Sequence, residues 1–392
     1  MAVNKVLVIG AGVGGLAAAA ALGQRGVAVD VVEVREDEHV LGVGINQPGN
    51  SLRALDALGV LEDVLAVGFP YDGNDYRDWN DERIVLVPSS LGDGRVPANC
   101  ALTRKELHTI LHAAADAAGA SVTYGVTVEA LEERDDSVAV TLSNGDVGVY
   151  DLVVAFDGVR SPMRRRLFGD AFEPVHTGSS VWRLQLPRPA DVTRTTLWQG
   201  DLVKGGVIPL SAESMYMLLV TREPGNPRHA PEDFGELLRE RLAGFSGLLA
   251  DIRESITSSQ GIVYSPLVEV QVPLPWHKGR VIVLGDAVHT AVPHLTQGAG
   301  MALEDAVVLA DEVTRDRPIE ESLVAVEALR YPRVDLVFNA SHAILEAEMQ
   351  VTADAIPAAA AGMREHLPGQ TAFVEGVLNQ PFRAQADQAA VN

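Results

Sequence analysis

Short hydrophobic runs followed by glycine-rich turns recur along the chain and predict the strands of a buried parallel sheet. Residues 6–9, 27–33, 152–156 and 280–284 are such runs, rich in valine, isoleucine and leucine, as expected where helices cover both faces of a sheet. Between the first two runs lies an alanine-rich stretch at 14–24 that favours a helix. A strand, a helix and a strand in this order predict an α/β protein that begins with a βαβ unit.

The middle of the chain has a different pattern. From about 172 to 269, hydrophobic residues alternate or cluster in short runs that prolines and glycines interrupt, which is typical of a mixed or antiparallel β-sheet. We therefore predict a β-rich domain at 172–269, inserted into a discontinuous nucleotide-binding domain at 1–171 and 270–320. A helical C-terminal segment and tail follow at 321–392. Other predicted elements are helices near 51–58, 104–118 and 231–244, strands near 83–87, 121–124, 126–133, 138–142, 180–186, 196–198 and 214–220, a glycine-rich loop at 42–50, and three late helices that end near 361.

Glycines in the first predicted turn have the spacing of a dinucleotide-binding motif. Gly10 permits the tight turn, Gly12 allows the backbone to approach a pyrophosphate, and Gly15 allows the helix to pack closely on the strand. The helix then directs its N-terminal amides and positive dipole end at the phosphates. Glu33 ends the second strand about 20 residues later, where an acidic side chain accepts hydrogen bonds from ribose hydroxyls. An acidic residue there favours FAD or NAD over NADP.

Two further motifs follow predicted buried strands. Asp157 and Gly158 come after the run at 152–156, and Asp286 comes after the run at 280–284. In open α/β sheets ligands bind at the carboxyl ends of the strands, so we expect Gly10, Asp157 and Asp286 to converge. Taken singly, an aspartate beside a glycine is more often a turn residue. The occurrence of all three motifs in this order makes the nucleotide interpretation the stronger one.

Composition restricts the possible partners. The chain has 392 residues and a net charge of −22, so it would repel nucleic acids and anionic membrane surfaces. Cys100 is the sole cysteine, which excludes an intrachain disulfide and a cysteine-based zinc site. No stretch has the roughly 20 uninterrupted apolar residues that span a bilayer. We expect a soluble cytoplasmic protein without a metal site.

With these motifs in place, the sequence resembles the single-component FAD-dependent aromatic hydroxylases, the group of flavoprotein monooxygenases related to salicylate and p-hydroxybenzoate hydroxylase. The resemblance extends from about residue 5 to residue 340. It implies a FAD-binding domain of the glutathione-reductase type and a β-sheet substrate domain. Members of that family have no separate nicotinamide-binding domain, and this chain has no second glycine-rich βαβ motif.

By position, the resemblance assigns most of the motif residues to FAD. The loop at 42–47 would flank one edge of the flavin, and Gln297 would lie at the start of the helix beside the other. Arg104 would lie against the phosphate region. The full set of implied FAD contacts is Gly10, Gly12, Gly14, Gly15, Glu33, Arg35, Arg104, Asp157, Gly158, Gly285, Asp286, Pro293, Gly298, Ala299, Gly300 and Met301.

The resemblance also implies the chemistry. In that family NADH or NADPH reduces non-covalent FAD, oxygen adds at flavin C4a, and the resulting hydroperoxide transfers an oxygen atom to a small aromatic or heteroaromatic substrate, usually a phenol. Arg183 and Gln185 are two residues apart on one predicted strand and so share a face. With His176 and Tyr216 they are the candidate catalytic residues of the substrate pocket, and Trp198 is a further candidate to line it, although each residue type is also common in packing or on a surface.

Other functions remain open at this point. A FAD-dependent reductase or dehydrogenase would share the FAD site without inserting oxygen. A flavin-dependent halogenase is disfavoured because its Trp-x-Trp-x-Ile-Pro segment is absent. A non-catalytic carrier with the same glycine motif would have no reason to keep all three motifs. The sequence is equally compatible with a monomer and with a homodimer.

Overall fold

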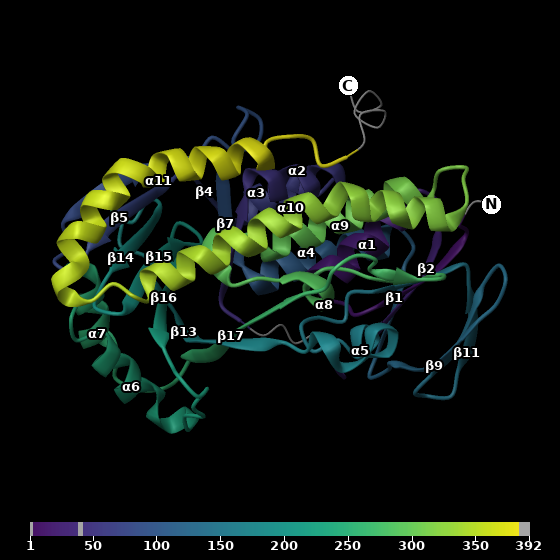
Figure 1. The fold of residues 1–392 in the computed structure, drawn as a ribbon, viewed down its shortest axis with the longest axis horizontal. Coiled ribbons are helices and arrows are strands. Elements are labelled where there is room, and N and C mark those ends of the chain that lie inside the picture. Colours follow the sequence, from purple (N-terminus) through teal and green to yellow (C-terminus); the bar gives the residue numbers. More distant parts are fainter. Residues whose placement is uncertain (1–2, 38–41, 384–392) are drawn as a thin grey trace.

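A six-stranded sheet forms the centre of one half of the molecule (Figure 1). The structure is a computed structural model that describes residues 3–37 and 42–383. The strand order is β18-β19-β12-β1-β2-β8, and every pairing is parallel except that of β18 with β19. The strands are β1 (Lys5–Ile9), β2 (Ala28–Glu33), β8 (Ser121–Tyr124), β12 (Leu152–Ala155), β18 (His277–Lys278) and β19 (Val281–Val283). The predicted buried parallel strands and the α/β class are confirmed.

Helices and a small antiparallel sheet cover the two faces of this sheet. Helix α1 contacts both α4 and α9, and the meander β9-β10-β11 lies at the other side of the parallel strands (Figure 1). The helices of this half are α1 (Val13–Gly23), α2 (Gly49–Ala57), α3 (Leu61–Val67), α4 (Arg104–Ala117) and α9 (Gly298–Val313), and the meander is β9 (Val128–Glu133), β10 (Val138–Leu142) and β11 (Val147–Tyr150). The helices and the meander share one hydrophobic core with the six-stranded sheet.

A three-stranded antiparallel sheet follows the βαβ unit. It consists of β3 (Gly44–Pro48), β7 (Asn99–Thr103) and β4 (Phe69–Tyr71), with β7 in the middle. The predicted glycine-rich loop at 42–50 is therefore wrong for most of its length. Residues 44–48 are extended because they pair with β7, and α2 begins directly afterwards at Gly49.

A seven-stranded sheet forms the other half, in the order β17-β13-β16-β15-β14-β5-β6. All its pairings are antiparallel except that of β14 with β5. Its strands are β5 (Asn74–Asp78), β6 (Arg83–Val87), β13 (Val175–Pro187), β14 (Thr195–Gln199), β15 (Val203–Pro209), β16 (Ser214–Arg222) and β17 (Val263–Gln271). Strands β5 and β6 come from outside the segment predicted to form this sheet, so the sheet extends beyond 172–269. The domain boundaries themselves stay a prediction.

The two faces of the seven-stranded sheet have different neighbours. On the back face, Trp182 and Met217 form a core with α6 (Phe234–Arg241) and α7 (Gly247–Ser255). On the front face, Ile208 and Tyr216 form a core with Ala101 of the three-stranded sheet. The front face is thus turned toward the half that contains the six-stranded sheet. The predicted helix at 231–244 is a 3-10 turn, η2 (Pro231–Asp233), followed by α6, and α7 was not predicted.

Two long helices complete the chain. Helix α10 (Ile319–Glu348) runs along both halves, and α11 (Ile356–Leu378) crosses the end of the molecule near β5 (Figure 1). The predicted end of the helices near 361 is wrong, because α11 continues for more than four turns and Arg364 Nε donates to the Ile84 carbonyl oxygen at 3.1 Å. Among the described residues, no helix is long and apolar enough to cross a membrane. The remaining short elements are α5 (Pro162–Phe168), α8 (Asp286–His289), η1 (Gly169–Phe172), η3 (Pro293–Leu295) and η4 (Ala353–Ala355).

Candidate active site

The turn between β1 and α1 combines tight packing with one open position. Gly10 has φ +101°, and a Cβ added to Gly15 would lie 1.8 Å from the Gly10 carbonyl oxygen. In contrast, a Cβ added to Gly12 would have no heavy atom within 4 Å. Gly12 is the N-cap residue of α1 and no side chain caps the helix, so the first amides of α1 face this open space. The turn has the form of a cradle for a phosphate group.

Glu33 is held against this turn. Its Oε2 accepts a hydrogen bond from the Ala11 amide at 2.9 Å, and its Oε1 accepts one from the Arg35 amide at 3.0 Å. The Glu33 residue is 7% exposed, and the Arg35 guanidinium lies beside it with Nε 3.4 Å from Oε1. A carboxylate fixed at the end of β2 and next to the glycine turn is suitably placed to accept ribose hydroxyls.

The three sequence motifs meet at one edge of the six-stranded sheet. Strands β1, β12 and β19 are neighbours in parallel register, with Ile9 beside Ala155 and Ala155 beside Val283. Their carboxyl ends therefore place Gly10, Asp157 and Asp286 side by side, as expected from the sequence. The Phe156 ring lies between the motifs, because a Cβ added to Gly14 or to Gly285 would lie within 2.4 Å or 3.0 Å of it. Sequence reasoning did not single out Phe156.

Two carboxyl groups at this edge lack strong partners. Asp157 Oδ2 accepts a hydrogen bond from the Met163 amide at 3.0 Å, whereas Oδ1 is buried and has no hydrogen-bond partner among the described residues. Burial raises the pKa of Asp157. Asp286 is exposed to solvent. The surrounding protein nevertheless desolvates its carboxyl group, which raises the pKa of Asp286, and the opposing effects of His289 and Arg104 are smaller. This combination indicates a concave setting that suits polar ligand groups.

The segment before α9 offers a second helix N-terminus to this region. Pro293 is exposed in η3, and no side chain caps the first turn of α9 at Gly298 to Gly300. A Cβ added to Gly298 would have only Asp286 Oδ1 near it, at 4.0 Å. Met301 is 1% exposed and its sulfur lies 3.4 Å from Arg330, so its contact with FAD stays a prediction. Its side chain lies in the core, and its amide donates to the Gln297 carbonyl oxygen at 2.8 Å.

A buried charge network supports this segment from behind. Asp305 accepts hydrogen bonds from Arg330 Nε at 2.7 Å and from the Gly285 amide at 3.0 Å, and lies 2.6 Å from His289 Nε2. Glu304 accepts two hydrogen bonds from Arg333 at 2.8 Å. The network joins α9, α10 and the Gly285 turn, and sequence reasoning missed its arginines. His289 is part of this network through its contact with Asp305, which makes it a structural residue.

Arg104 occupies the first position of α4 and reaches toward the same region. The capping box of Thr103 and Glu106 fixes the start of the helix, and a Cβ added to Gly42 would lie 2.6 Å from Arg104 Cδ. The Arg104 guanidinium is exposed and makes no hydrogen bond or ion pair within the described residues. It is electrostatically coupled to Asp286 on one side and to Arg183 on the other. Part of the loop predicted at 42–47, namely 44–47, is strand β3.

Arg183 and Tyr216 lie together on the front face of the seven-stranded sheet. Desolvation lowers the pKa of Arg183 to about 10, and burial raises the pKa of Tyr216, which is 6% exposed. A Cβ added to Gly44 would lie 2.4 Å from the Tyr216 ring, so Tyr216 faces β3. Neither side chain has a hydrogen-bond partner within the described residues. Gln185 shares this face but is exposed to solvent.

Two other predicted pocket residues lie elsewhere. Both ring nitrogens of His176 bond within its own strand, Nε2 to the Ser179 carbonyl oxygen at 3.0 Å and Nδ1 to the Gly178 amide at 3.3 Å. Trp198 belongs to the back-face core, where Nε1 donates to Asp81 at 2.8 Å. Trp198 therefore does not line a front-face pocket. The two-residue periodicity of a strand shows which residues share a face of the sheet. It does not show which face is turned toward the half with the predicted FAD contacts.

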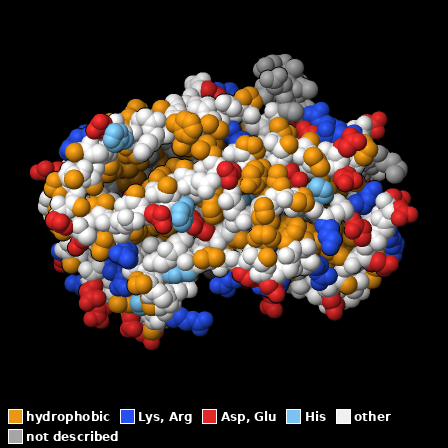
Figure 2. All heavy atoms as spheres, viewed as in Figure 1, with side chains coloured by type: hydrophobic (Ala, Val, Ile, Leu, Met, Phe, Trp, Pro, Cys, Tyr) orange, Lys and Arg blue, Asp and Glu red, His pale blue; other side chains and the backbone are white. Residues whose placement is uncertain are grey.

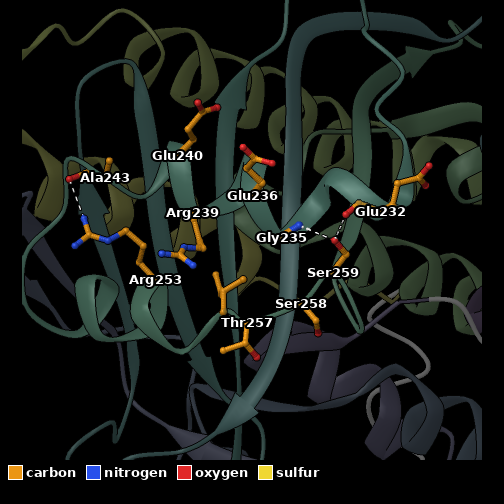
Figure 3. A pocket seen from close by; sticks show the side chains of 11 residues that line it. Glu232, Gly235, Glu236, Arg239, Glu240, Ala243, Arg253, Thr257, Ser258 and Ser259 are labelled. Carbon is orange, nitrogen blue, oxygen red and sulfur yellow. Dashed lines mark hydrogen bonds between the residues drawn. The ribbon is translucent and has the colours of Figure 1, made fainter.

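An open surface groove of about 790 Å³ lies between α6 and α7 and the segment that follows them (Figure 3). Charged side chains of both signs, such as Glu236 and Arg239, point into it. Because α6 and α7 cover the back face of the seven-stranded sheet, the groove is separated from the glycine turn by that sheet. In the described part of the chain, no group of three or more His, Cys, Asp or Glu residues could hold a metal ion.

Comparison with known proteins agrees with this geometry. The FAD binding domain family model matches residues 4–315. The chain is 33% identical to the 2-heptyl-3-hydroxy-4(1H)-quinolone synthase of Pseudomonas aeruginosa, over 85% of this chain and 86% of that protein. The chain belongs to the FAD-dependent monooxygenases. The 3-amino-4-hydroxybenzoate 2-monooxygenase of Streptomyces cremeus is 30% identical, with 87% of each chain covered.

A solved structure supports the fold of this monooxygenase. The structure of Klebsiella pneumoniae HpxO complexed with FAD and uric acid superimposes with a TM-score of 0.86 at 24% identity, covering 96% of this chain and 97% of that one. The resemblance to FAD-dependent aromatic hydroxylases, FAD as the cofactor and the FAD-binding α/β fold are thus confirmed. The open cradle at Gly12 and the unpaired oxygen of Asp157 are consistent with a site for FAD.

Proposed function

We propose that this monooxygenase uses NAD(P)H and oxygen to hydroxylate a small aromatic or heteroaromatic ring that carries an acidic or phenolic group. The observation that carries the proposal is the meeting of Gly12, Asp157 and Asp286 at one sheet edge, beside an uncapped N-terminus of α9. Arg183 and Tyr216 approach the same region from the seven-stranded sheet. A cofactor site and a substrate face are thereby adjacent.

FAD contacts are distributed along this edge in the proposal. Glu33 and Arg35 hold the ADP ribose, the α1 amides at Gly12 hold the pyrophosphate, and Arg104 adds a positive charge. Asp286 binds the ribityl side. Bound FAD supplies the capacity to take a hydride from the nicotinamide and to activate oxygen.

The start of α9 lies beside the flavin ring in this arrangement. Its free amides at Gly298 to Gly300 stabilise negative charge there, because the positive end of a helix dipole favours an anion. The buried network of Asp305 and Arg330 keeps that helix start fixed. A fixed helix start needs no reorganisation when charge develops on the ring.

Arg183 gives the front face of the seven-stranded sheet a preference for substrates with an anionic or strongly accepting group. A guanidinium that is desolvated and has no carboxylate partner attracts an anion or a strong acceptor. The nearby Tyr216 hydroxyl offers a second hydrogen bond. The named substrates and products of the relatives fit such a face: a quinolone and an aminohydroxybenzoate are rings that each carry an oxygen acceptor.

A FAD-dependent reductase that does not insert oxygen is the second candidate, because it would need the same cofactor site. Anaerobic reduction of the flavin by NADH and by NADPH, with and without a panel of hydroxylated aromatic acids and N-heterocycles, tests the proposal. We expect one ring class to accelerate bleaching of the flavin. Bleaching at one rate with every ring would favour the reductase, and a protein that holds no FAD would overturn both.

A further inference from the structure

The turn that leads into α9 has an unusual backbone conformation. Thr296, directly after η3, has φ +54° and ψ +26°, which lie in the left-handed region. Four non-glycine residues in the described part of the chain have a positive φ, and only Thr296 among them is β-branched; the others are Asp81, Leu202 and Asn226. A β-branched side chain is a genuine outlier in this region, because its Cβ crowds the backbone. The conformation of Thr296 is therefore strained, and neighbouring groups have to hold it.

Asn46 of β3 holds the Thr296 side chain. Its Nδ2 donates to Thr296 Oγ1 at 3.2 Å and to Asn99 Oδ1 of the neighbouring strand β7 at 2.9 Å. Both Asn46 and Asn99 are buried. Asn46 and Thr296 are 250 positions apart in the sequence. The hydrogen bond between them ties the three-stranded sheet to the turn before α9.

The same contact has a second unfavourable feature. Asn46 Oδ1 is buried and has no hydrogen-bond partner among the residues that the structure describes. A buried acceptor without a donor costs free energy, as does a threonine in the left-handed region. Thr296→Gly would avoid the strain and would not need Asn46. A contact with two such costs is better explained by what it positions than by a contribution to stability.

The turn at Thr296 determines where the first amides of α9 point. Gln297, the next residue, is the N-cap residue of α9, and its side chain bonds to Asn50 of α2. The body of α9 is fixed, since it is buried from Gly300 to Val313 and packs against α10. In Figure 1 α10 passes in front of α9, and in Figure 2 the side chains along α10 cover this part of the molecule. The direction in which the chain enters the helix is thus set at Thr296, which Asn46 holds.

The first amides of α9 face the region proposed for the flavin. A Cβ added to Gly298 would have only Asp286 Oδ1 near it, at 4.0 Å, so the space beside the first turn is open. No side chain caps the helix, and free N–H groups at the positive end of a helix dipole favour an anion. In the proposed arrangement this anion is the reduced flavin. A change of direction in the turn would move the amides away from the ring and lose part of this stabilisation.

We propose that Asn46 is a positioning residue for the cofactor: its amide holds Thr296 in the left-handed conformation and so keeps the first amides of α9 directed at the flavin ring. The contact thereby raises the reduction potential of bound FAD, because these amides stabilise the negative charge that reduction places on the ring. The inference rests on the proposed function in one respect, the place of the flavin beside α9. It depends neither on the substrate nor on the reaction with oxygen.

The two-electron reduction potential of the FAD-loaded protein, measured against a reference dye without oxygen or substrate, tests the inference. Asn46→Ala removes the donor, and Thr296→Val removes the hydroxyl that accepts from it but keeps the β-branched shape. We expect both variants to lower the potential by about 30 mV or more, which is about a tenfold change in the two-electron equilibrium. Thr296→Gly should keep the wild-type potential, since glycine adopts a positive φ without being held.

The double variant Asn46→Ala with Thr296→Gly separates positioning from direct contact. If Asn46 acts through Thr296, the double variant should have the wild-type potential, because its turn needs no support. A potential as low as that of Asn46→Ala alone would show that Asn46 acts on the flavin itself and would refute the positioning role. A wild-type potential in Asn46→Ala would refute it as well.

Asn339→Ala is the control and should keep the wild-type potential, because Asn339 is exposed on α10 and donates to a carbonyl oxygen of its own helix. Unfolding temperatures of the apoproteins identify variants that are damaged in general, and Thr296→Gly should unfold no earlier than wild type. If Asn46→Ala does not fold, the two single variants of Thr296 decide the question, since equal potentials in them would overturn the inference. Wild type that holds no FAD would contradict the proposed function instead.

Discussion

Glu33 Oε2 accepts a hydrogen bond from the Ala11 amide at 2.9 Å, which ties the end of β2 to the turn between β1 and α1. We predict that Glu33→Ala weakens FAD binding by about tenfold or more, because a charged hydrogen bond to the ribose is lost. The apoprotein titrated with FAD, with flavin fluorescence as the signal, gives the dissociation constant. Glu36→Ala, at an exposed residue nearby, is the control. Equal FAD affinity in the Glu33 variant would remove the residue from the site.

The glycines of the turn should separate FAD binding from folding. Gly12→Val places a side chain where the protein has open space. In Gly15→Ala, the new Cβ would lie 1.8 Å from the Gly10 carbonyl oxygen. We expect the Gly12 variant to keep its unfolding temperature as apoprotein and to lose FAD, because the side chain fills the phosphate cradle. The Gly15 variant should lose stability itself. A yellow, fully loaded Gly12→Val protein would contradict the pyrophosphate assignment.

Arg330 is fully buried between Glu304 and Asp305. Removing one partner of a buried ion pair leaves an uncompensated charge, so we expect Arg330→Met to lower the free energy of unfolding by about 3–5 kcal/mol. Urea unfolding measures this change. Arg165→Met is the comparison, since Arg165 pairs with Glu173 on the surface, and it should leave stability almost unchanged.

The same network predicts how stability depends on pH. Burial raises the pKa values of Glu304 and Asp305, but the neighbouring arginines and His289 outweigh it and hold both below the usual 4.5 and 3.8. Carboxyl groups with lowered pKa values stabilise the fold above these values and lose that contribution as the pH falls through the folded values. The deficit of Arg330→Met should therefore shrink in acid. A deficit that is constant from neutral pH to acid would contradict the assigned charges.

Arg183→Ala should keep FAD and weaken the binding of ring acids. The residue lies on the front face of the seven-stranded sheet, beyond the sheet edge that holds the predicted FAD contacts. We expect KM for a confirmed substrate to rise by about tenfold or more, because an arginine–carboxylate hydrogen bond is lost. Arg166→Ala, at an exposed arginine of α5, is the control. An unchanged KM would remove Arg183 from the pocket.

Local sequence signals predicted the FAD half of the molecule well. The glycine turn, Glu33 and the strands before Asp157 and Asp286 are encoded within short segments, and the parallel register of β1, β12 and β19 then brings them together. The strand β3 was missed because its partner β7 is more than 50 residues away, and glycines in 42–50 suggested a loop. Pairing of distant segments overrides local preference in such cases.

The helical end and the substrate face were harder to predict for the same reason. Gly362, Pro368 and Gly369 weaken the helical pattern of α11, yet contacts such as Arg364 to β6 hold it in place. Trp198 of β14 and Tyr216 of β16 are both aromatic residues of the same sheet, but only packing decides that one faces α6 and α7 and the other β3. The buried ion pair in which Lys204 Nζ donates to Glu348 Oε1 also has no local signal, because the two residues are 144 positions apart in the sequence.

Isotopic labelling shows whether the enzyme inserts an atom of molecular oxygen into its substrate. The FAD-loaded protein, a reduced nicotinamide and the ring that most accelerates flavin bleaching would be incubated under isotopically heavy oxygen gas, and the product weighed by mass spectrometry. We expect a hydroxylated ring that carries one heavy oxygen atom, with one nicotinamide consumed for each product formed. Nicotinamide consumption that yields only hydrogen peroxide and an unchanged ring, for every ring that accelerates bleaching, would contradict it.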